Sequence, residues 1–373
     1  MELMFSISII PSLPVFRQAG MPGLSNGVKG DLLSVLKVGV MGCGYIAQSV
    51  HLPMLTRLPG VQLVALAEAN PERLKKAILF APKAVPYSHY KKLLERDEVE
   101  AVVICLPNDL HAEAAIASLE LGKHLYLEKP LATTLVEGRK ILNAWQKVGT
   151  VGMIGFNFRF HPLYKAARQA IRSGRIGDLV SVRSVFSTAM QYLDPGEQSP
   201  QTRSLLLDLA SHHVDLIQYF LGQEVQNVWA SVRSPEDAAT LELQFTTGLL
   251  VQSFFSWNAV EEDRFEFYGR KGKLAMDRYL SLDLEFTDPL RIFDRPKRLG
   301  RWIRSLGKIP YALNKVFSPI HEPSYRVALQ HFLTAVKTNR PPSPDLMDGY
   351  HSLKMIKAAE ESARTGLRVS VGG

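Results

Sequence analysis

Apolar and polar positions divide the chain into two parts. Between residues 35 and 127, short runs that are apolar throughout alternate with stretches of helical composition. We expect β-strands at residues 35–40, 62–67, 101–106 and 124–127, and helices at residues 46–57, 71–80, 90–96 and 111–121. Because a strand that is apolar throughout is buried on both faces, the pattern predicts a doubly wound parallel sheet, an α/β domain over residues 35–154.

Beyond about residue 180, polar and apolar positions alternate, as in residues 240–245, which a Thr-Thr-Gly turn follows. Such alternation leaves one face of a sheet in water. We expect strands at residues 180–186, 227–232, 239–245, 250–257, 264–268 and 273–276, and closing helices at residues 325–338 and 348–365. The pattern predicts an α+β domain over residues 155–373. Its strands should form an antiparallel meander, and the sheet should be open and largely antiparallel. Residues 1–34 are a separate N-terminal extension.

A chain of 373 residues is long enough for these two domains. Its net charge of +8 gathers mostly in residues 291–315, within a basic insertion at about residues 288–320. The rest is close to charge balance, so we do not expect nucleic-acid binding. The basic stretch has the composition of an amphipathic helix for an anionic membrane surface, or of an arm that packs on a neighbouring subunit. We favour the arm, and with it a homo-oligomer, a dimer or tetramer.

Two cysteines, Cys43 and Cys105, lie in apolar contexts and predict neither a disulfide framework nor a metal cluster. No apolar run reaches the roughly 18 residues that a membrane span needs. The first 16 residues are apolar but contain Glu2 and two prolines and lack a basic start, so we favour a loose extension over a secretory leader. A reducing, cytoplasmic setting fits these features.

The first expected strand runs into Gly42-Cys43-Gly44-Tyr45-Ile46-Ala47, a G-x-G-x-x-A stretch that opens a helix. Gly42 permits a tight turn, Gly44 lets the backbone approach a pyrophosphate, and Ala47 lets the helix pack close to the strand. The helix N-terminus, with Tyr45 and Ile46, then faces the anion. The stretch therefore predicts a dinucleotide site, although a plain strand-to-helix turn remains the alternative.

Glu68 ends the second expected strand, 26 residues after Gly42. A carboxylate at this position binds a ribose 2′-hydroxyl and repels a 2′-phosphate. The expected cofactor is therefore NAD, with NADP less favoured. The alternative is that Glu68 is a solvated loop residue.

The strand at residues 124–127 ends in Glu128-Lys129-Pro130. The proline holds Lys129 extended, and a cis Lys-Pro bond would fix the amine at one place beyond the carboxyl end of the strand. Ligands of open α/β sheets bind at that edge. Lys129 is therefore a candidate for proton transfer, with an ordinary surface lysine as the alternative.

Residues 205–222 predict a helix that stops at Gly222. Spacings of four, three and four place Asp208, His212, Asp215 and Tyr219 on one stripe, and His213 lies on the apolar stripe beside it. Asp208 can orient His212, and a histidine that titrates near neutrality can exchange a proton with a substrate hydroxyl. For the ionisable stripe the alternative is a solvated face.

His213, on the apolar stripe, is expected in the core. Adjacent histidines such as His212 and His213 point about 100° apart on a helix, so they do not form the pair that a zinc site needs. We expect no metal.

Six stretches together resemble the glucose-fructose oxidoreductase/inositol dehydrogenase family, Gfo/Idh/MocA, from about Lys37 to Met276. They are residues 38–44, 107–111, 128–130, 155–160, 208–215 and 268–272. The resemblance implies an N-terminal Rossmann domain, a C-terminal open sheet, and NAD(P)-dependent oxidation or reduction at a carbon of a sugar, inositol or sugar derivative. Residues 201–204 depart from it, because members commonly carry a glycine run there.

The resemblance also implies roles for individual residues. Lys129 matches the catalytic lysine, Asp208 the substrate-positioning acid and His212 the proton-transfer histidine. The stretches expected on the cofactor side contain Pro107, Asn108, His111, Glu128 and Lys129. Asn157 and Arg159 match the start of the substrate domain, where we expect substrate contacts together with Lys129, Asp208 and His212.

The hypothesis is therefore hydride transfer between nicotinamide and a carbinol or keto carbon, with Lys129 and His212 in proton transfer. Two alternatives stay open: an NAD-dependent glycosidase that uses transient oxidation, and a non-catalytic dinucleotide-binding regulator of the same fold.

Overall fold

The computed structural model describes residues 35–189, 204–233, 236–289 and 322–372. The N-terminal extension, the basic insertion from residue 290 onward and three of the four residues at 201–204 lie outside these ranges.

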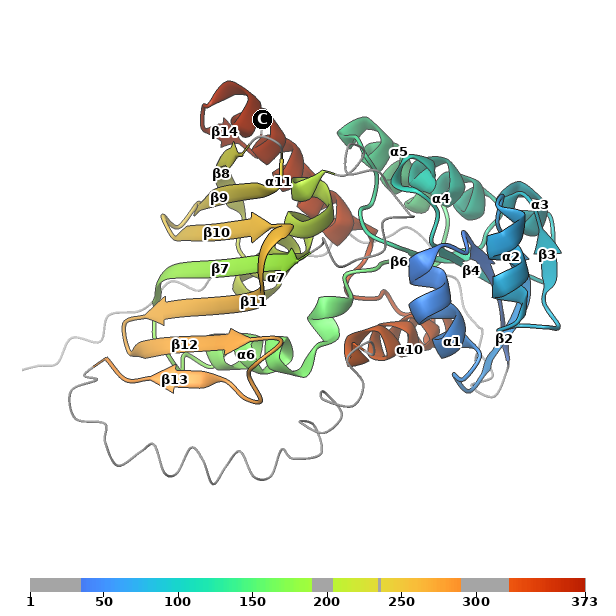
Figure 1. The fold of residues 1–373 in the computed structure, drawn as a ribbon, viewed down its shortest axis with the longest axis horizontal. Helices are drawn as coiled ribbons and strands as arrows, with labels where there is room; N and C mark the ends of the chain where they lie inside the picture. The colour runs from blue at the N-terminus through green and yellow to red at the C-terminus, as the bar shows by residue number, and fades with distance from the viewer. Residues whose placement is uncertain (1–34, 190–203, 234–235, 290–321, 373) are drawn as a thin grey trace, which may run out of the picture.

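A six-stranded parallel sheet forms the first half of the molecule, in the order β3-β2-β1-β4-β5-β6 (Figure 1). This is the strand order of a Rossmann fold, with the switch point between β1 and β4. The strands are β1 (Leu36–Met41), β2 (Val61–Ala67), β3 (Val85–Tyr87), β4 (Ala101–Ile104), β5 (His124–Leu127) and β6 (Gly152–Ile154). The predicted doubly wound sheet is confirmed, and the pattern missed only the short strands β3 and β6.

Helices cover both faces of this sheet. One face carries α3 (Tyr90–Leu94), α4 (His111–Glu120) and α5 (Leu135–Trp145). The other carries the π-helix η1 (Ala47–His51), α1 (Leu52–Leu55), α2 (Pro71–Ile78) and α10 (Pro323–Thr338). We expected α10 with the second domain, yet its Leu329 and Phe332 share a buried cluster with Val38 and Val40 of β1. The chain therefore returns to complete the first core.

The second sheet has eight strands in the order β13-β12-β11-β7-β10-β9-β8-β14. They are β7 (Leu179–Ala189), β8 (Val225–Val232), β9 (Ala238–Phe245), β10 (Leu250–Ser256), β11 (Asn258–Gly269), β12 (Gly272–Asp277), β13 (Glu285–Thr287) and β14 (Val369–Ser370). The simple meander is wrong in one respect, because β7 lies between β11 and β10 and pairs with β10 in parallel. A helix and the strands β8 and β9 lie between β7 and β10 in the sequence, and a parallel pair needs such a long connection.

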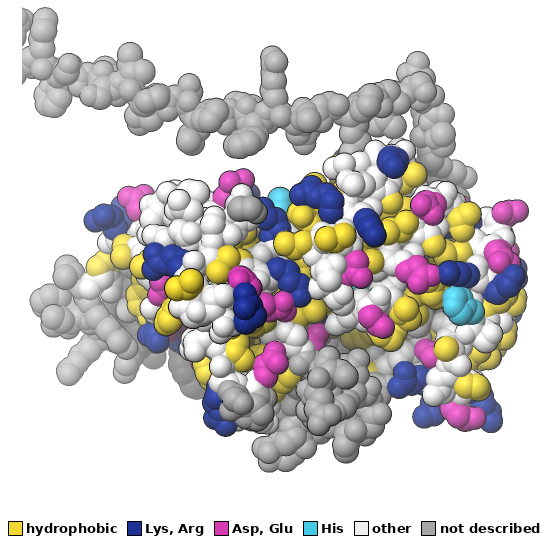
Figure 2. All heavy atoms as spheres, turned by 90° about the horizontal axis from the view of Figure 1, so that it is seen from above, with side chains coloured by type: hydrophobic (Ala, Val, Ile, Leu, Met, Phe, Trp, Pro, Cys, Tyr) yellow, Lys and Arg dark blue, Asp and Glu magenta, His cyan; other side chains and the backbone are white. Residues whose placement is uncertain are grey.

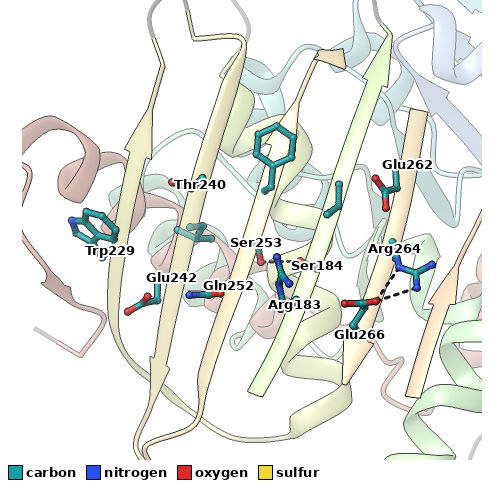
Figure 3. Close-up of a pocket in the computed structure, with 13 residues that line it drawn as sticks. Arg183, Ser184, Trp229, Thr240, Glu242, Gln252, Ser253, Glu262, Arg264 and Glu266 are labelled. Atoms are coloured by element: carbon teal, nitrogen blue, oxygen red, sulfur yellow. Dashed lines mark hydrogen bonds and ion pairs between the residues drawn. The ribbon is translucent and has the colours of Figure 1, made fainter. Parts of the chain in front are cut away.

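One face of this sheet is covered by α6 (Pro162–Arg172), α7 (Ser211–Leu221) and α11 (Leu346–Thr365), as Figure 1 shows. In β10, Val251 and Phe255 are buried beneath these helices while Gln252 and Phe254 face the other way. That open face holds a shallow hollow with Arg183, Trp229 and Glu242 among its lining side chains (Figure 3). The predicted alternation is confirmed.

Acidic and basic side chains are interspersed over the face of the molecule shown in Figure 2. No helix within the described ranges is long and apolar enough to cross a membrane.

Candidate functional site

The loop after β1 makes a tight turn and leaves space above it. Gly42 has φ +85°, and an added Cβ there would collide with the backbone carbonyl of Cys105 at the end of β4. The Cβ position of Gly44 has no atom within 4 Å. A helix begins directly after Gly44, and the N–H groups of a first helical turn have no partners within the helix. This geometry accommodates a pyrophosphate.

Glu68 at the end of β2 is fixed against this loop. Its Oε2 accepts a hydrogen bond from the Cys43 N–H at 2.8 Å, and its Oε1 accepts one from the Asn70 N–H at 2.9 Å. The Gln48 side chain in turn donates to the Cys43 carbonyl at 2.6 Å. Glu68 is therefore held beside the loop, and a carboxylate has lone pairs left for a ribose hydroxyl. The residues present fit NAD.

Lys129 joins the first half of the chain to the second. Its Nζ donates to the backbone carbonyl of Asp208 at 3.0 Å, and the Lys129-Pro130 bond is cis. Asn108, beyond the end of β4, reaches the same residue, with its Nδ2 at 3.4 Å from the Asp208 Oδ1. Asp208 belongs to the π-helix η6 (Leu206–Ala210), which continues into α7. Three of the predicted residues therefore meet at the carboxyl edge of the parallel sheet.

His212 lies one turn after Asp208 and is buried, with its ring stacked on Phe158 at 4.5 Å between centroids. Its Nδ1 is buried without a hydrogen-bond partner among the described residues. Burial, and then the positive charges of Lys129 and Arg278, hold the pKa of His212 well below its usual value. The expectation that His212 titrates near neutrality is therefore wrong for this environment. Its imidazole is neutral at pH 7, the form that accepts a proton.

Glu128 connects the Lys129 segment to the helix of the glycine loop. Its Oε1 lies 2.7 Å from Nε2 of the fully buried His51 in η1, and its Oε2 accepts a hydrogen bond from the Lys129 N–H at 3.2 Å. One carboxylate thus contacts both the helix that follows the glycine loop and the backbone that carries Lys129.

His111 is sealed in the protein. Its Nδ1 lies 2.6 Å from the Pro130 carbonyl and its Nε2 lies 2.9 Å from the Leu106 carbonyl. Burial lowers the pKa of His111, against the two carbonyls that raise it. The His111 ring thus links the backbone at Leu106 to the backbone at Pro130. A contribution of His111 to cofactor binding stays a prediction.

Asn157 and Arg159, in the 3-10 helix η3 (Asn157–Phe160), both have protein partners. Asn157 donates to the Ser324 hydroxyl of α10 at 2.8 Å. The Arg159 guanidinium binds Asp215 through Nε at 2.8 Å and Nη2 at 2.5 Å, and Nη2 lies 3.1 Å from Asp348 of α11. The predicted polar stripe is thus divided. Asp208 contacts Lys129 through its backbone carbonyl, whereas Asp215 binds Arg159. Substrate binding by Asn157 and Arg159 stays a prediction.

His213 lies in the core, as predicted, with its Nε2 at 3.1 Å from Asp263 of β11. Asp263 also accepts hydrogen bonds from Tyr164 at 2.6 Å and from Arg278 Nε at 2.5 Å. Burial alone would raise the pKa of Asp263, but Arg278, His213 and Tyr164 hold it well below its usual value. No local motif in the sequence marks this network, because its members come from separate elements.

Within the described part of the chain, no group of three or more His, Cys, Asp or Glu residues could hold a metal ion.

Comparison with known proteins gives a consistent result for both halves. Residues 36–156 match a family model described as an oxidoreductase family with an NAD-binding Rossmann fold, and residues 164–275 match the GFO/IDH/MocA C-terminal domain. Together the two matches include more than half of the chain.

Two curated relatives are similar along much of their length. The myo-inositol 2-dehydrogenase of Thermotoga maritima is 27% identical over 341 residues, 88% of this chain and 96% of that protein. The dTDP-3,4-didehydro-2,6-dideoxy-alpha-D-glucose 3-reductase of Actinomadura kijaniata is 30% identical over 251 residues, 65% of this chain and 75% of that protein.

A solved structure of levoglucosan dehydrogenase in complex with NADH and levoglucosan has a TM-score of 0.75 at 24% identity, covering 91% of this chain and all of that one. At this identity the likeness shows the fold. The Rossmann strand order, the glycine loop with its acid and the family matches in both halves lead to the same assignment. The chain belongs to the Gfo/Idh/MocA family of oxidoreductases, with an NAD-binding Rossmann domain.

Proposed function

We propose that this NAD-dependent oxidoreductase transfers a hydride between nicotinamide and a carbinol or keto carbon of a sugar, inositol or sugar derivative. The observation that carries the proposal is the contact of Lys129 Nζ with the Asp208 carbonyl at 3.0 Å, one helical turn before His212. This contact supports an amine and an imidazole that act together at the edge where ligands bind to open α/β sheets. The names of the relatives supply the substrate class.

The protein's share of the chemistry is binding, orientation and proton movement. NAD, when bound, supplies the hydride acceptor. The first-turn N–H groups after Gly44 and the Glu68 carboxylate would hold it. The Lys129 ammonium donates a hydrogen bond toward a substrate oxygen and stabilises negative charge that develops there. The neutral imidazole of His212 takes up the hydroxyl proton, and Asp208 accepts hydrogen bonds from other hydroxyls.

The electrostatics favour oxidation of an alcohol over reduction of a ketone at neutral pH. Burial and the charge of Lys129 keep the pKa of His212 low, so the base form is the populated one. A general base in its neutral form is ready to accept a proton, whereas ketone reduction needs a proton donor. We therefore expect the rate of oxidation to be nearly constant around neutral pH and to fall only under acidic conditions, where His212 takes up a proton.

A panel of polyols and sugars, followed by the absorbance of reduced nicotinamide, tests the proposal. With the best substrate, Lys129→Met should lower kcat by about 100-fold to 1,000-fold, because it removes the hydrogen-bond donor and the positive charge that stabilise the substrate oxygen. Its NAD affinity should stay within about twofold. Lys140→Met, at an exposed position of α5, is the matched control and should behave as wild type. Unchanged turnover in the Lys129 variant would refute the assignment.

The two alternatives give different outcomes in the same assay. A glycosidase that oxidises its substrate only transiently would cleave a glycoside without net formation of reduced nicotinamide. A non-catalytic regulator would bind NAD and turn over nothing in the panel. The presence of both Lys129 and His212 supports the dehydrogenase over the regulator.

A further inference from the structure

Behind His212 lies a buried guanidinium that the proton-transfer scheme does not use. Arg278 directly follows β12 and is 9% exposed. Its Nε donates to Asp263 at 2.5 Å, its Nη1 to Glu322 at 2.7 Å and its Nη2 to the Tyr279 hydroxyl at 2.9 Å. These bonds come from β11, from the N-cap of α10 and from its own segment. The position of the guanidinium is therefore set from three directions.

Phe158 connects this guanidinium to His212. The Arg278 Cζ lies 4.3 Å from the Phe158 ring centroid, a cation–π distance, and the His212 ring stacks on the same phenyl ring at 4.5 Å with 26° between the planes. Phe158 is itself 7% exposed. The imidazole thus has an aromatic platform instead of a hydrogen bond at Nδ1 to define its orientation.

We propose that Arg278 is a positioning residue for His212: its guanidinium, fixed by Asp263 and Glu322, holds Phe158 as the platform of the imidazole and supplies a permanent positive charge beside it. A charge that disfavours an imidazolium keeps His212 in the form that accepts a proton. The role of His212 in proton transfer comes from the proposed function, on which this inference rests.

Charged groups from several elements act on His212, so the contribution of Arg278 must be separated from theirs. Lys129, beyond β5, and Arg278 both oppose protonation, as does His213 on the same helix, whereas Asp263 of β11 favours it. Asp208 faces Asn108. Removing the Arg278 charge takes away a repulsion that opposes protonation of His212. It also leaves the negative charge of Asp263 uncompensated, and both changes raise the pKa of His212.

The size of the effect follows from the geometry. The Arg278 Cζ lies 4.3 Å from the Phe158 centroid, and that centroid lies 4.5 Å from the centre of the His212 ring. The guanidinium carbon and the imidazole centre are therefore at most about 9 Å apart. At that separation and an effective dielectric constant near 20, loss of a unit charge should raise the pKa of His212 by about one unit.

The experiment is an NMR titration of the full-length protein with isotopically labelled histidine, in which His212→Asn identifies the His212 signal. Arg278→Gln keeps a planar donor for Asp263 but loses the charge, and should shift the His212 midpoint upward by about one pH unit. Arg278→Lys keeps the charge and should titrate within about 0.3 units of wild type. Arg175→Gln, which removes another arginine stacked on an aromatic ring, Phe286, should cause no shift.

A His212 midpoint in Arg278→Gln equal to that of wild type would overturn the inference. Because the titration needs no substrate, it distinguishes this failure from failure of the proposed function. Should Arg278→Gln not fold, Phe158→Leu leaves the ion pairs of Arg278 in place and removes the platform. We then expect kcat to fall about tenfold with NAD affinity unchanged, and an unchanged kcat would overturn the inference.

Discussion

Removing one member of the buried pair of Arg159 and Asp215 should destabilise the fold strongly, because the other charge is then left buried without its partner. Asp215→Asn removes the charge that faces the guanidinium while leaving Arg159 in place. Arg159 is 5% exposed and Asp215 is 1% exposed, so water cannot replace the lost partner. Breaking a buried ion pair by removing one member typically costs about 3–5 kcal/mol.

A second carboxylate moderates this cost. Asp348 lies 3.1 Å from the Arg159 Nη2 and its side chain is 29% exposed, so it continues to compensate part of the charge. We therefore expect Asp215→Asn to lower the free energy of unfolding by about 3 kcal/mol, at the lower end of that range. Asp348→Asn, which removes the more exposed of the two charges that face Arg159, should cost about 1 kcal/mol or less.

Urea unfolding followed by tryptophan fluorescence and by circular dichroism measures both variants against wild type. Coincidence of the two probes establishes that a single free energy describes the transition. Equal, small losses for Asp215→Asn and Asp348→Asn would refute the reasoning, because they would mean that the Arg159 charge is solvated and free to meet other groups, including a substrate.

Two further predictions concern the cofactor loop and acid stability. Gly42→Ala should destabilise the fold, because its φ of +85° and the Cys105 carbonyl leave no place for a Cβ, whereas Gly44→Ala should fold normally and bind NAD more weakly, measured by thermal unfolding and calorimetric titration. If both variants bind NAD as wild type does, the loop assignment is wrong. Burial lowers the pKa values of His111, His212 and His213. Below pH about 6.5 the unfolded chain therefore takes up protons that the folded protein does not, and stability should fall by up to about 1.4 kcal/mol per pH unit for each histidine. A urea midpoint that stays constant from pH 7 to pH 5 would contradict this.

The positions of most strands and of the glycine loop could be predicted from short stretches of the sequence. The apolar strands, the alternating strands and the glycine loop follow from burial and from turn geometry, and each was found at or near its predicted position. The parallel pair of β7 and β10 was not predictable in this way, because a pairing between strands that a helix and two further strands separate in the sequence leaves no signal in either strand. The return of α10 to the first sheet is likewise a long-range choice, since its apolar stripe fits any apolar face.

Some residues of the candidate site could likewise be predicted from the sequence, and others could not. Lys129, Asp208 and the glycine loop could be found because each occupies a short motif at the end of a strand or the start of a helix. The environment of His212 could not, because its pKa depends on Lys129, Arg278 and Asp263, which lie 83, 66 and 51 residues away in the sequence. The uniform polar stripe on α7 also failed as a description, because the π-helix at its start and the Arg159 pair assign its two halves to different neighbours.

Hydride transfer itself is tested most directly with the best polyol or sugar of the panel carrying deuterium at the carbon that is oxidised. The reduced nicotinamide formed by the enzyme is then isolated and its deuterium content measured by mass spectrometry. Direct hydride transfer predicts one deuterium per reduced nicotinamide, with one ketone formed for each. Reduced nicotinamide without deuterium, or a product formed without net reduction of NAD, would contradict it.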